Sequence, residues 1–127
     1  MAFRDLALVA LGGATGSMLR YSVGRTFGAA SAGSSQWPWH TFAVNIVGAF
    51  AIGLLVVAAG RFGWPAWWRP LLAVGVLGGF TTFSAFSLET VEAALTGHAG
   101  LAAGYVVGSI AAGLAGCWLG VVVGRAL

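Results

Sequence analysis

The segment Gly78-Gly79-Phe80-Thr81-Thr82-Phe83-Ser84-Ala85-Phe86 combines helix-breaking glycines, hydroxyl groups and aromatic rings within one apolar stretch. Two adjacent glycines followed by two threonines make a poor continuous helix. A membrane tolerates such an interruption where it lines a cavity or binds a ligand, because freed backbone groups find no water in hydrocarbon. We therefore expect this segment to be the working part of the protein.

The other polar side chains within apolar stretches are amides and hydroxyls rather than central acids. At a rise of ~1.5 Å per residue, Asn45 lies about 9 Å inside its stretch, and Thr41 precedes it by one turn on the same face. Tyr105 and Ser109 repeat this spacing later in the chain. For the amide of Asn45 two interpretations stay open: a hydrogen-bonded link between helices and a group that faces a ligand.

These amides and hydroxyls donate hydrogen bonds without carrying a charge. The ring edges of Phe83 and Phe86, three residues apart on one helical face, are weakly positive. Neutral donors and ring edges suit a small, strongly hydrated anion, because they replace water without holding the ion too tightly for it to leave. The residues therefore predict a pathway for such an anion.

Charged residues flank this predicted pathway. Glu89 lies nineteen residues beyond Pro70, so about 28 Å along a helix and near the far interface. A carboxylate there costs less than the roughly 2.5–3.5 kcal/mol of a central one. Glu89 and Glu92 thus belong either to a solvated helix end or to a vestibule. Arg20 either extends outward to the interface or attracts anions.

The composition places these residues in a membrane. Of 127 residues, 59% are hydrophobic and 7% are charged, whereas about 25% of the residues of a soluble domain are charged. The net charge of +3 comes from arginines scattered one or two per loop. That scatter argues against nucleic-acid binding and fits interfacial anchors and topology signals.

The hydrophobic pattern predicts an all-α membrane protein with four transmembrane helices of roughly 20 residues or more each. Phe80 lies ten residues beyond Pro70, about 15 Å deep, so the third helix is expected to break near the midplane. Glycines four residues apart predict close helix packing. We expect one domain over residues 1–127, with spans at about 3–28, 41–60, 70–95 and 101–123.

Several chemistries are excluded by what the chain lacks. Cys117 is the single cysteine, so no internal disulfide is possible. His40 and His98 have no second ligand at metal-binding spacing. No Ser/His, Asp/Asp or metal-ligand pairing meets at membrane depth, so we predict that the protein is not an enzyme.

Three motifs resemble the Fluc (CrcB-type) family of fluoride channels, and the resemblance covers essentially the whole chain. They are Gly12-Gly13-Ala14-Thr15-Gly16 with Arg20-Tyr21, Asn45 with Gly48, and the most specific one, Gly78-Gly79-Phe80-Thr81-Thr82-Phe83-Ser84. The resemblance implies a passive, highly selective channel of the bacterial inner membrane that exports fluoride and relieves its toxicity. It also implies an antiparallel, dual-topology homodimer with two pores lined by both subunits.

The resemblance further implies roles for individual residues. The backbone carbonyls of Gly78 and Thr81 would hold a structural sodium ion, the implied cofactor, at the dimer centre. Arg20 and Glu89 would lie at the vestibule. The fluoride pathway would be formed by Asn45, Phe83, Phe86, Thr41, Thr82, Ser84, Tyr105 and Ser109.

One departure from the family pattern concerns the hydroxyls of the pathway. The family commonly has Ser-Thr before the second phenylalanine, where this chain has Ser84-Ala85. One hydroxyl of the expected track is therefore missing. Either conduction is slower for that reason, or a neighbour such as Thr82 supplies the hydroxyl.

A second departure concerns orientation in the membrane. The expected end that carries the N-terminus has more arginines than the other end, which favours a single orientation. The partner is therefore either a second copy or an oppositely inserted homologous chain. The arginines of the first end are Arg4, Arg61, Arg69 and Arg125, against Arg25 and Arg20.

Two other functions stay open at this point. A small dual-topology, proton-coupled exporter has a similar size but depends on a carboxylate deep in its first helix, where this chain has only Asp5 at the edge. A non-transporting scaffold or assembly subunit would explain the glycine spacing but not the interrupted third span. Fluoride efflux from liposomes without a pH gradient distinguishes these functions from a channel.

Overall fold

The computed structural model describes residues 2–27 and 35–127. Four helical spans in this part of the chain are long and apolar enough to cross a membrane. The predicted all-α fold with four spans is therefore confirmed, while the predicted end of the first span at Gly28 lies outside the described residues. The helices are α1 (Ala2–Phe27), α2 (Trp39–Arg61), the third span formed by π-helical η1 (Arg69–Leu77) with α3 (Gly78–Phe80) and α4 (Phe83–Leu95), and α5 (Ala99–Ala126).

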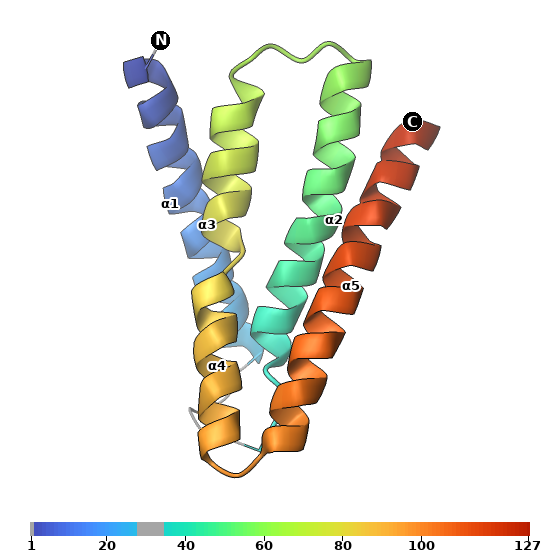
Figure 1. Ribbon diagram of the computed structural model, residues 1–127. Coiled ribbons are helices and arrows are strands. Elements are labelled where there is room, and N and C mark those ends of the chain that lie inside the picture. The colour runs from blue at the N-terminus through green and yellow to red at the C-terminus, as the bar shows by residue number, and fades with distance from the viewer. Residues whose placement is uncertain (1, 28–34) are drawn as a thin grey trace.

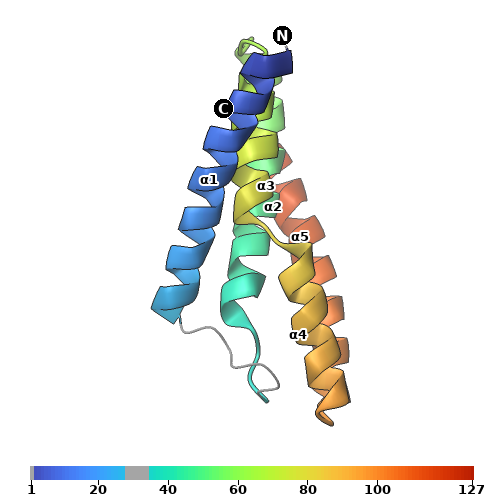
Figure 2. The ribbon, with the colours of Figure 1, turned by 90° about the vertical axis from the view of Figure 1, so that its left-hand side faces the viewer.

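The spans pack as two pairs. Helix α1 runs along η1 and α3, and α2 runs along α5. Figure 1 shows both chain ends and the α2–η1 connection at one end of the molecule, with the α4–α5 turn at the other. In the perpendicular view of Figure 2 the chain is narrow, and α1 and α4 diverge from each other.

A single chain has a small interior. The buried hydrophobic residues are mostly small, whereas large side chains such as Phe3, Leu6 and Leu114 are exposed. A water-soluble protein could not expose so much apolar surface. Lipid or another protein chain must therefore cover these faces.

Two helix contacts depend on glycine. A Cβ atom at Gly12 of α1 would lie 2.9 Å from the Cα atom of Gly75 in η1. A Cβ atom at Gly120 of α5 would lie 2.9 Å from the backbone nitrogen of Leu54 in α2. Real Cβ atoms do not approach so closely, so both helix pairs need glycine for their backbones to meet. The glycine spacing in the sequence correctly indicated this packing.

Two residues with extended backbone separate α3 from α4. Thr81 has φ −81° and ψ 159°, and Thr82 has φ −152° and ψ 118°. The Thr81 hydroxyl donates to the carbonyl of Leu77 at 2.8 Å, and the Thr82 hydroxyl accepts the N–H of Ala85 at 3.2 Å. Thr82 is therefore the N-cap of α4, a position that suits threonine. Side chains of the segment itself thus bond the Leu77 carbonyl on one side of the interruption and the Ala85 N–H on the other.

Candidate functional site

The extended segment redirects two backbone donors. In a continuous helix the N–H groups of residues 82 and 85 would bond the carbonyls four residues earlier. Here the Thr82 N–H donates to Oδ1 of Asn45 at 2.8 Å, and the Ala85 N–H donates to the Thr82 hydroxyl at 3.2 Å. The carbonyls of Gly78 and Thr81 thus lose the donors that a helix would give them. Carbonyl oxygens free in this way fit a hard cation such as sodium.

Arg20 interacts with the same interruption from α1. Its Nε atom donates to the carbonyl of Gly79 at 3.0 Å. The end of a helix carries partial negative charge on its unpaired carbonyls, so a cation there is favourable. Arg20 therefore extends inward to the interruption, and the alternative that it reaches outward to the interface is wrong.

Asn45 connects α2 to the interruption through both ends of its amide. Its Nδ2 atom donates to the Thr82 carbonyl at 3.0 Å, while its Oδ1 atom accepts the Thr82 N–H. An amide nitrogen has two N–H groups, so one donor is left over for a ligand. Asn45 is thus a hydrogen-bonded link between helices, which was one of its two interpretations. The other, a group that faces an ion, stays a prediction that depends on the second N–H.

A cavity of about 270 Å³ lies beside the link between Asn45 and Thr82, and several residues of the predicted pathway line it. The rings of Phe83 and Phe86 are tilted by 42° with centroids 5.5 Å apart. The buried hydroxyl of Ser109 has no hydrogen-bond partner among the described residues. A buried hydroxyl without a partner is free to donate to an anion. The cavity is lined by Asn45, Thr81, Thr82, Phe83, Phe86, Ser109 and Ile110.

Glu89 is held by hydroxyl groups from two other helices. Thr41 of α2 donates to Oε1 at 2.6 Å, and Tyr105 of α5 donates to Oε2 at 2.7 Å. Both donors are fully buried, and the Glu89 side chain is 17% exposed. The interpretation of Glu89 as a freely solvated helix end is therefore wrong. The hydroxyl protons of Thr41 and Tyr105 are both donated to Glu89. These two hydrogen bonds must therefore break before either hydroxyl can donate to an ion in the pathway.

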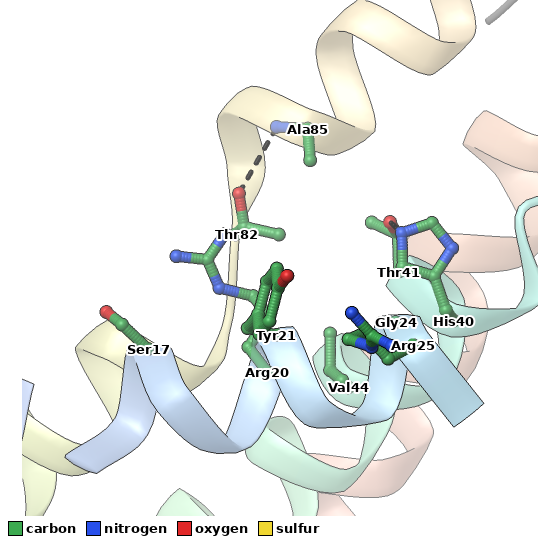
Figure 3. Close-up of a pocket in the computed structure, with 10 residues that line it drawn as sticks. All are labelled: Ser17, Arg20, Tyr21, Gly24, Arg25, His40, Thr41, Val44, Thr82 and Ala85. Carbon is green, nitrogen blue, oxygen red and sulfur yellow. Dashed lines mark hydrogen bonds between the residues drawn. The ribbon is translucent and has the colours of Figure 1, made fainter. Parts of the chain in front are cut away.

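A larger cavity of about 670 Å³ lies between α1, α2 and the start of α4. Figure 3 shows the side chain of Arg20 beside Thr82, with Arg25 and His40 among the other residues that line the cavity. Two arginines and no acidic side chain line it, so its potential attracts anions. The complete lining is Ser17, Arg20, Tyr21, Gly24, Arg25, His40, Thr41, Val44, Thr82 and Ala85.

Thr82 lines both cavities, so the interruption stands between them. The predicted vestibule residue Arg20 lines the larger cavity, whereas Glu89 lines neither. Ser84 also lines neither, although its hydroxyl lies 3.2 Å from that of Thr82. Phe83 is 78% exposed on the single chain. The predicted pathway residues are therefore near one another but do not form one closed tube within one chain.

His40 is the residue of this region that the sequence did not indicate. Its Nε2 atom lies 3.0 Å from the Thr41 hydroxyl and 3.6 Å from Oε1 of Glu89. The search for metal ligands by spacing could not reveal it, because Glu89 is on another helix. The only signal was its position directly before Thr41.

Comparisons with known proteins agree on one family. The profile of the family described as CrcB-like protein, Camphor Resistance (CrcB), matches residues 7–121. A "Fluoride-specific ion channel FluC" of Novosphingobium aromaticivorans is 47% identical over 119 residues, which cover 94% of each chain. The protein of that name from Agrobacterium fabrum is 48% identical over 124 residues, or 97% of this chain and 98% of the relative. "Fluoride-specific ion channel FluC 1" of Mycobacterium bovis is 41% identical over 124 residues, or 97% of this chain and 92% of the relative.

Proposed function

This chain belongs to the CrcB-like protein family, and from that premise we propose that it is a passive, highly selective channel that exports fluoride and so relieves fluoride toxicity. The relatives carry the name of an ion channel and not of an enzyme. With four apolar spans the chain is a multi-pass membrane protein, and in bacteria such a protein lies in the inner membrane.

The observation that supports the proposal most strongly is the small cavity beside the interruption. It is lined by Asn45, whose amide has one N–H left over, by Ser109, whose hydroxyl has no partner among the described residues, and by the two phenylalanine rings. Fluoride must exchange a tight hydration shell for other donors in order to enter hydrocarbon. Neutral hydroxyls, amides and ring edges provide such donors without the strong binding of a full positive charge. Residues of this kind suit conduction better than storage of the ion.

The larger cavity supports an anion vestibule. Its two arginines raise the local anion concentration, and Thr82 connects it to the small cavity. A fluoride ion would collect near Arg20, pass Thr82 and reach the rings of Phe83 and Phe86. The hydroxyls of Thr41, Ser84 and Tyr105 would add donors along the way once their present partners release them. Glu89 would act at the side of the vestibule through Thr41.

Assembly as an antiparallel homodimer with dual topology is the second part of the proposal. Phe83 projects from the exposed surface of the single chain, and much of the apolar surface is uncovered. A second copy related by an axis in the membrane plane would bring its own interruption next to this one. Two pores, each lined by both copies, would then enclose the phenylalanine rings.

A structural sodium ion at the centre of that dimer completes the proposal. The carbonyls of Gly78 and Thr81 have lost their helical donors, so two copies would offer four such oxygens. Bound between the pores, a cation would stabilise the pair and make the local potential favourable to anions. Dimers in sodium-free buffer are therefore expected to be less stable than dimers in sodium.

Ion efflux from liposomes that contain only this protein tests the function. Under a potassium gradient with valinomycin, fluoride should leave rapidly while chloride stays inside, with no pH gradient. Phe83→Ile and Phe86→Ile keep apolar volume but remove the ring edges, so flux should fall about tenfold or more if the rings replace hydration. Size-exclusion chromatography checks that these variants still assemble.

Each alternative has its own outcome in this assay. Efflux that requires a pH gradient would support the proton-coupled exporter. Absence of fluoride efflux would support a scaffold or a missing partner chain. Unchanged flux in both phenylalanine variants would remove the ring edges from the mechanism while leaving the channel in place.

A further inference from the structure

We propose that His40 is a positioning residue that makes fluoride flux depend on pH, by giving Glu89 a positive partner when the imidazole is protonated. The proposal rests on the fluoride transport proposed above. It concerns a side chain at the rim of the larger cavity, 16% exposed, which contacts both Thr41 and the carboxylate of Glu89.

The hydrogen bonds fix where the ring proton of His40 lies. An ionised carboxylate only accepts, so the 2.6 Å bond from Thr41 to Glu89 uses the single hydroxyl proton of Thr41. The 3.0 Å contact between that hydroxyl and Nε2 of His40 must then be donated by the histidine. The neutral ring therefore carries its proton on Nε2, which leaves Nδ1 as the site for a second proton. Nδ1 is buried and has no hydrogen-bond partner among the described residues, so attraction to Glu89 must offset the cost of the added N–H.

The charged and titratable groups around His40 come from three other helices. From α1, Arg20, Tyr21 and Arg25 line the same cavity, and a Cβ atom at Gly24 would lie 3.7 Å from Cδ2 of the ring. From α4, Glu89 places Oε1 at 3.6 Å from Nε2. From α5, Tyr105 reaches this group only through Glu89, to which it donates.

Glu89 is the group that decides the sign of the effect. Arg25 is exposed, so solvent and salt screen its repulsion of a charged imidazole. Arg20 is bonded to the Gly79 carbonyl, whose partial negative charge offsets it. Glu89 is nearly buried and in direct contact, where screening is weak. Protonation of His40 therefore creates a close ion pair rather than an isolated cation.

This ion pair bears on transport because Glu89 stands beside the vestibule. A lone carboxylate near the path raises the energy of a passing anion. The positive charge of a protonated His40 offsets the negative charge of the Glu89 carboxylate. The Thr41 hydroxyl stays between His40 and Glu89. Flux should therefore rise as pH falls.

The test is fluoride efflux at equal pH on both sides of the liposome, with protein-free liposomes to subtract neutral hydrogen fluoride. Between about pH 8 and about pH 5.5 we expect the flux to rise roughly fivefold if the imidazole acts as the switch. His40→Gln retains an N–H donor without a charge and should give a flat profile. His40→Lys carries a fixed charge and should give high flux at both ends of the range.

His98 provides the matched control. It is the N-cap residue of α5, and its ring lies 3.2 Å from the Thr96 hydroxyl, so His98→Gln should keep the wild-type profile. Flux that does not change with pH in the wild type, or a dependence that persists in His40→Gln, would overturn the role of His40. Loss of flux in both His40 variants would show a structural role only and overturn it as well. Absence of fluoride efflux from the wild type at every pH would instead overturn the proposed function and this inference with it.

Discussion

The amide of Asn45 in α2 bonds both backbone groups of Thr82, the N–H and the carbonyl, in the extended segment. Thr82 is buried, so water cannot replace the amide if it is lost. A short polar side chain thereby holds open a stretch of backbone that helix propensity alone would leave poorly defined. The same residue lines the small cavity.

Asn45→Leu should abolish fluoride flux and lower the stability of the proposed dimer without preventing assembly. The substitution leaves the N–H and C=O of Thr82 buried without partners, at a cost of about 1–3 kcal/mol for each unpaired group. Flux assays and thermal unfolding in detergent measure the two effects. Val47→Leu, at an exposed position on the same helix, is the control. A variant that conducts like the wild type would contradict both roles of Asn45.

At the scale of helices, glycine positions decide which backbones can meet. Gly12→Ala places a methyl group against the Gly75 backbone of η1, with no flexible atom to move aside. Overpacking of this kind costs about 1–3 kcal/mol. We therefore expect a lower thermal midpoint for Gly12→Ala, measured as the fraction of protein that stays folded and soluble in detergent after heating.

Gly13→Ala is the matched control for this contact. A Cβ atom there meets nothing within 4 Å. Alanine also favours a helix over glycine by about 1 kcal/mol, so the control should be neutral or stabilising. Equal stability of the two variants would show that the close contact of α1 with η1 does not support the fold.

The helices were predictable from sequence because their signals are local. Long apolar runs gave the four spans, and the glycines with Thr81 and Thr82 indicated where the third span leaves helical geometry. The partners of Glu89 were not predictable, because Thr41, Tyr105 and His40 come from distant parts of the chain. Depth along a helix suggested a solvated end for Glu89, but packing of α4 on α2 and α5 covers most of its side chain. Tertiary contacts of single polar groups have no periodic signature.

At the scale of the whole molecule, the arginines favour one orientation in the membrane, whereas the proposed antiparallel dimer needs chains inserted in both orientations. Figure 1 places both termini and the α2–η1 connection at one end, and Arg61 donates to the carbonyl of Arg125 there at 3.2 Å. Arg4 and Arg69 lie on elements that reach the same end. An arginine-rich end tends to stay in the cytoplasm. Equal insertion in both directions is therefore not the expected default.

We predict that fewer than half of the chains in cells expose their C-terminus outside the cytoplasm. A cysteine at position 127 in a Cys117→Ser background reports this fraction through an impermeant thiol reagent. Arg4→Gln combined with Arg69→Gln should raise the fraction toward one half, because arginine sets orientation and acidic residues contribute little. Asp5→Asn is the control and should leave it unchanged. If the fraction of exposed C-termini does not change when the arginines are replaced, packing against a partner, and not charge, selects the orientation. If labelling shows a single orientation, an antiparallel pair would require an oppositely inserted partner chain.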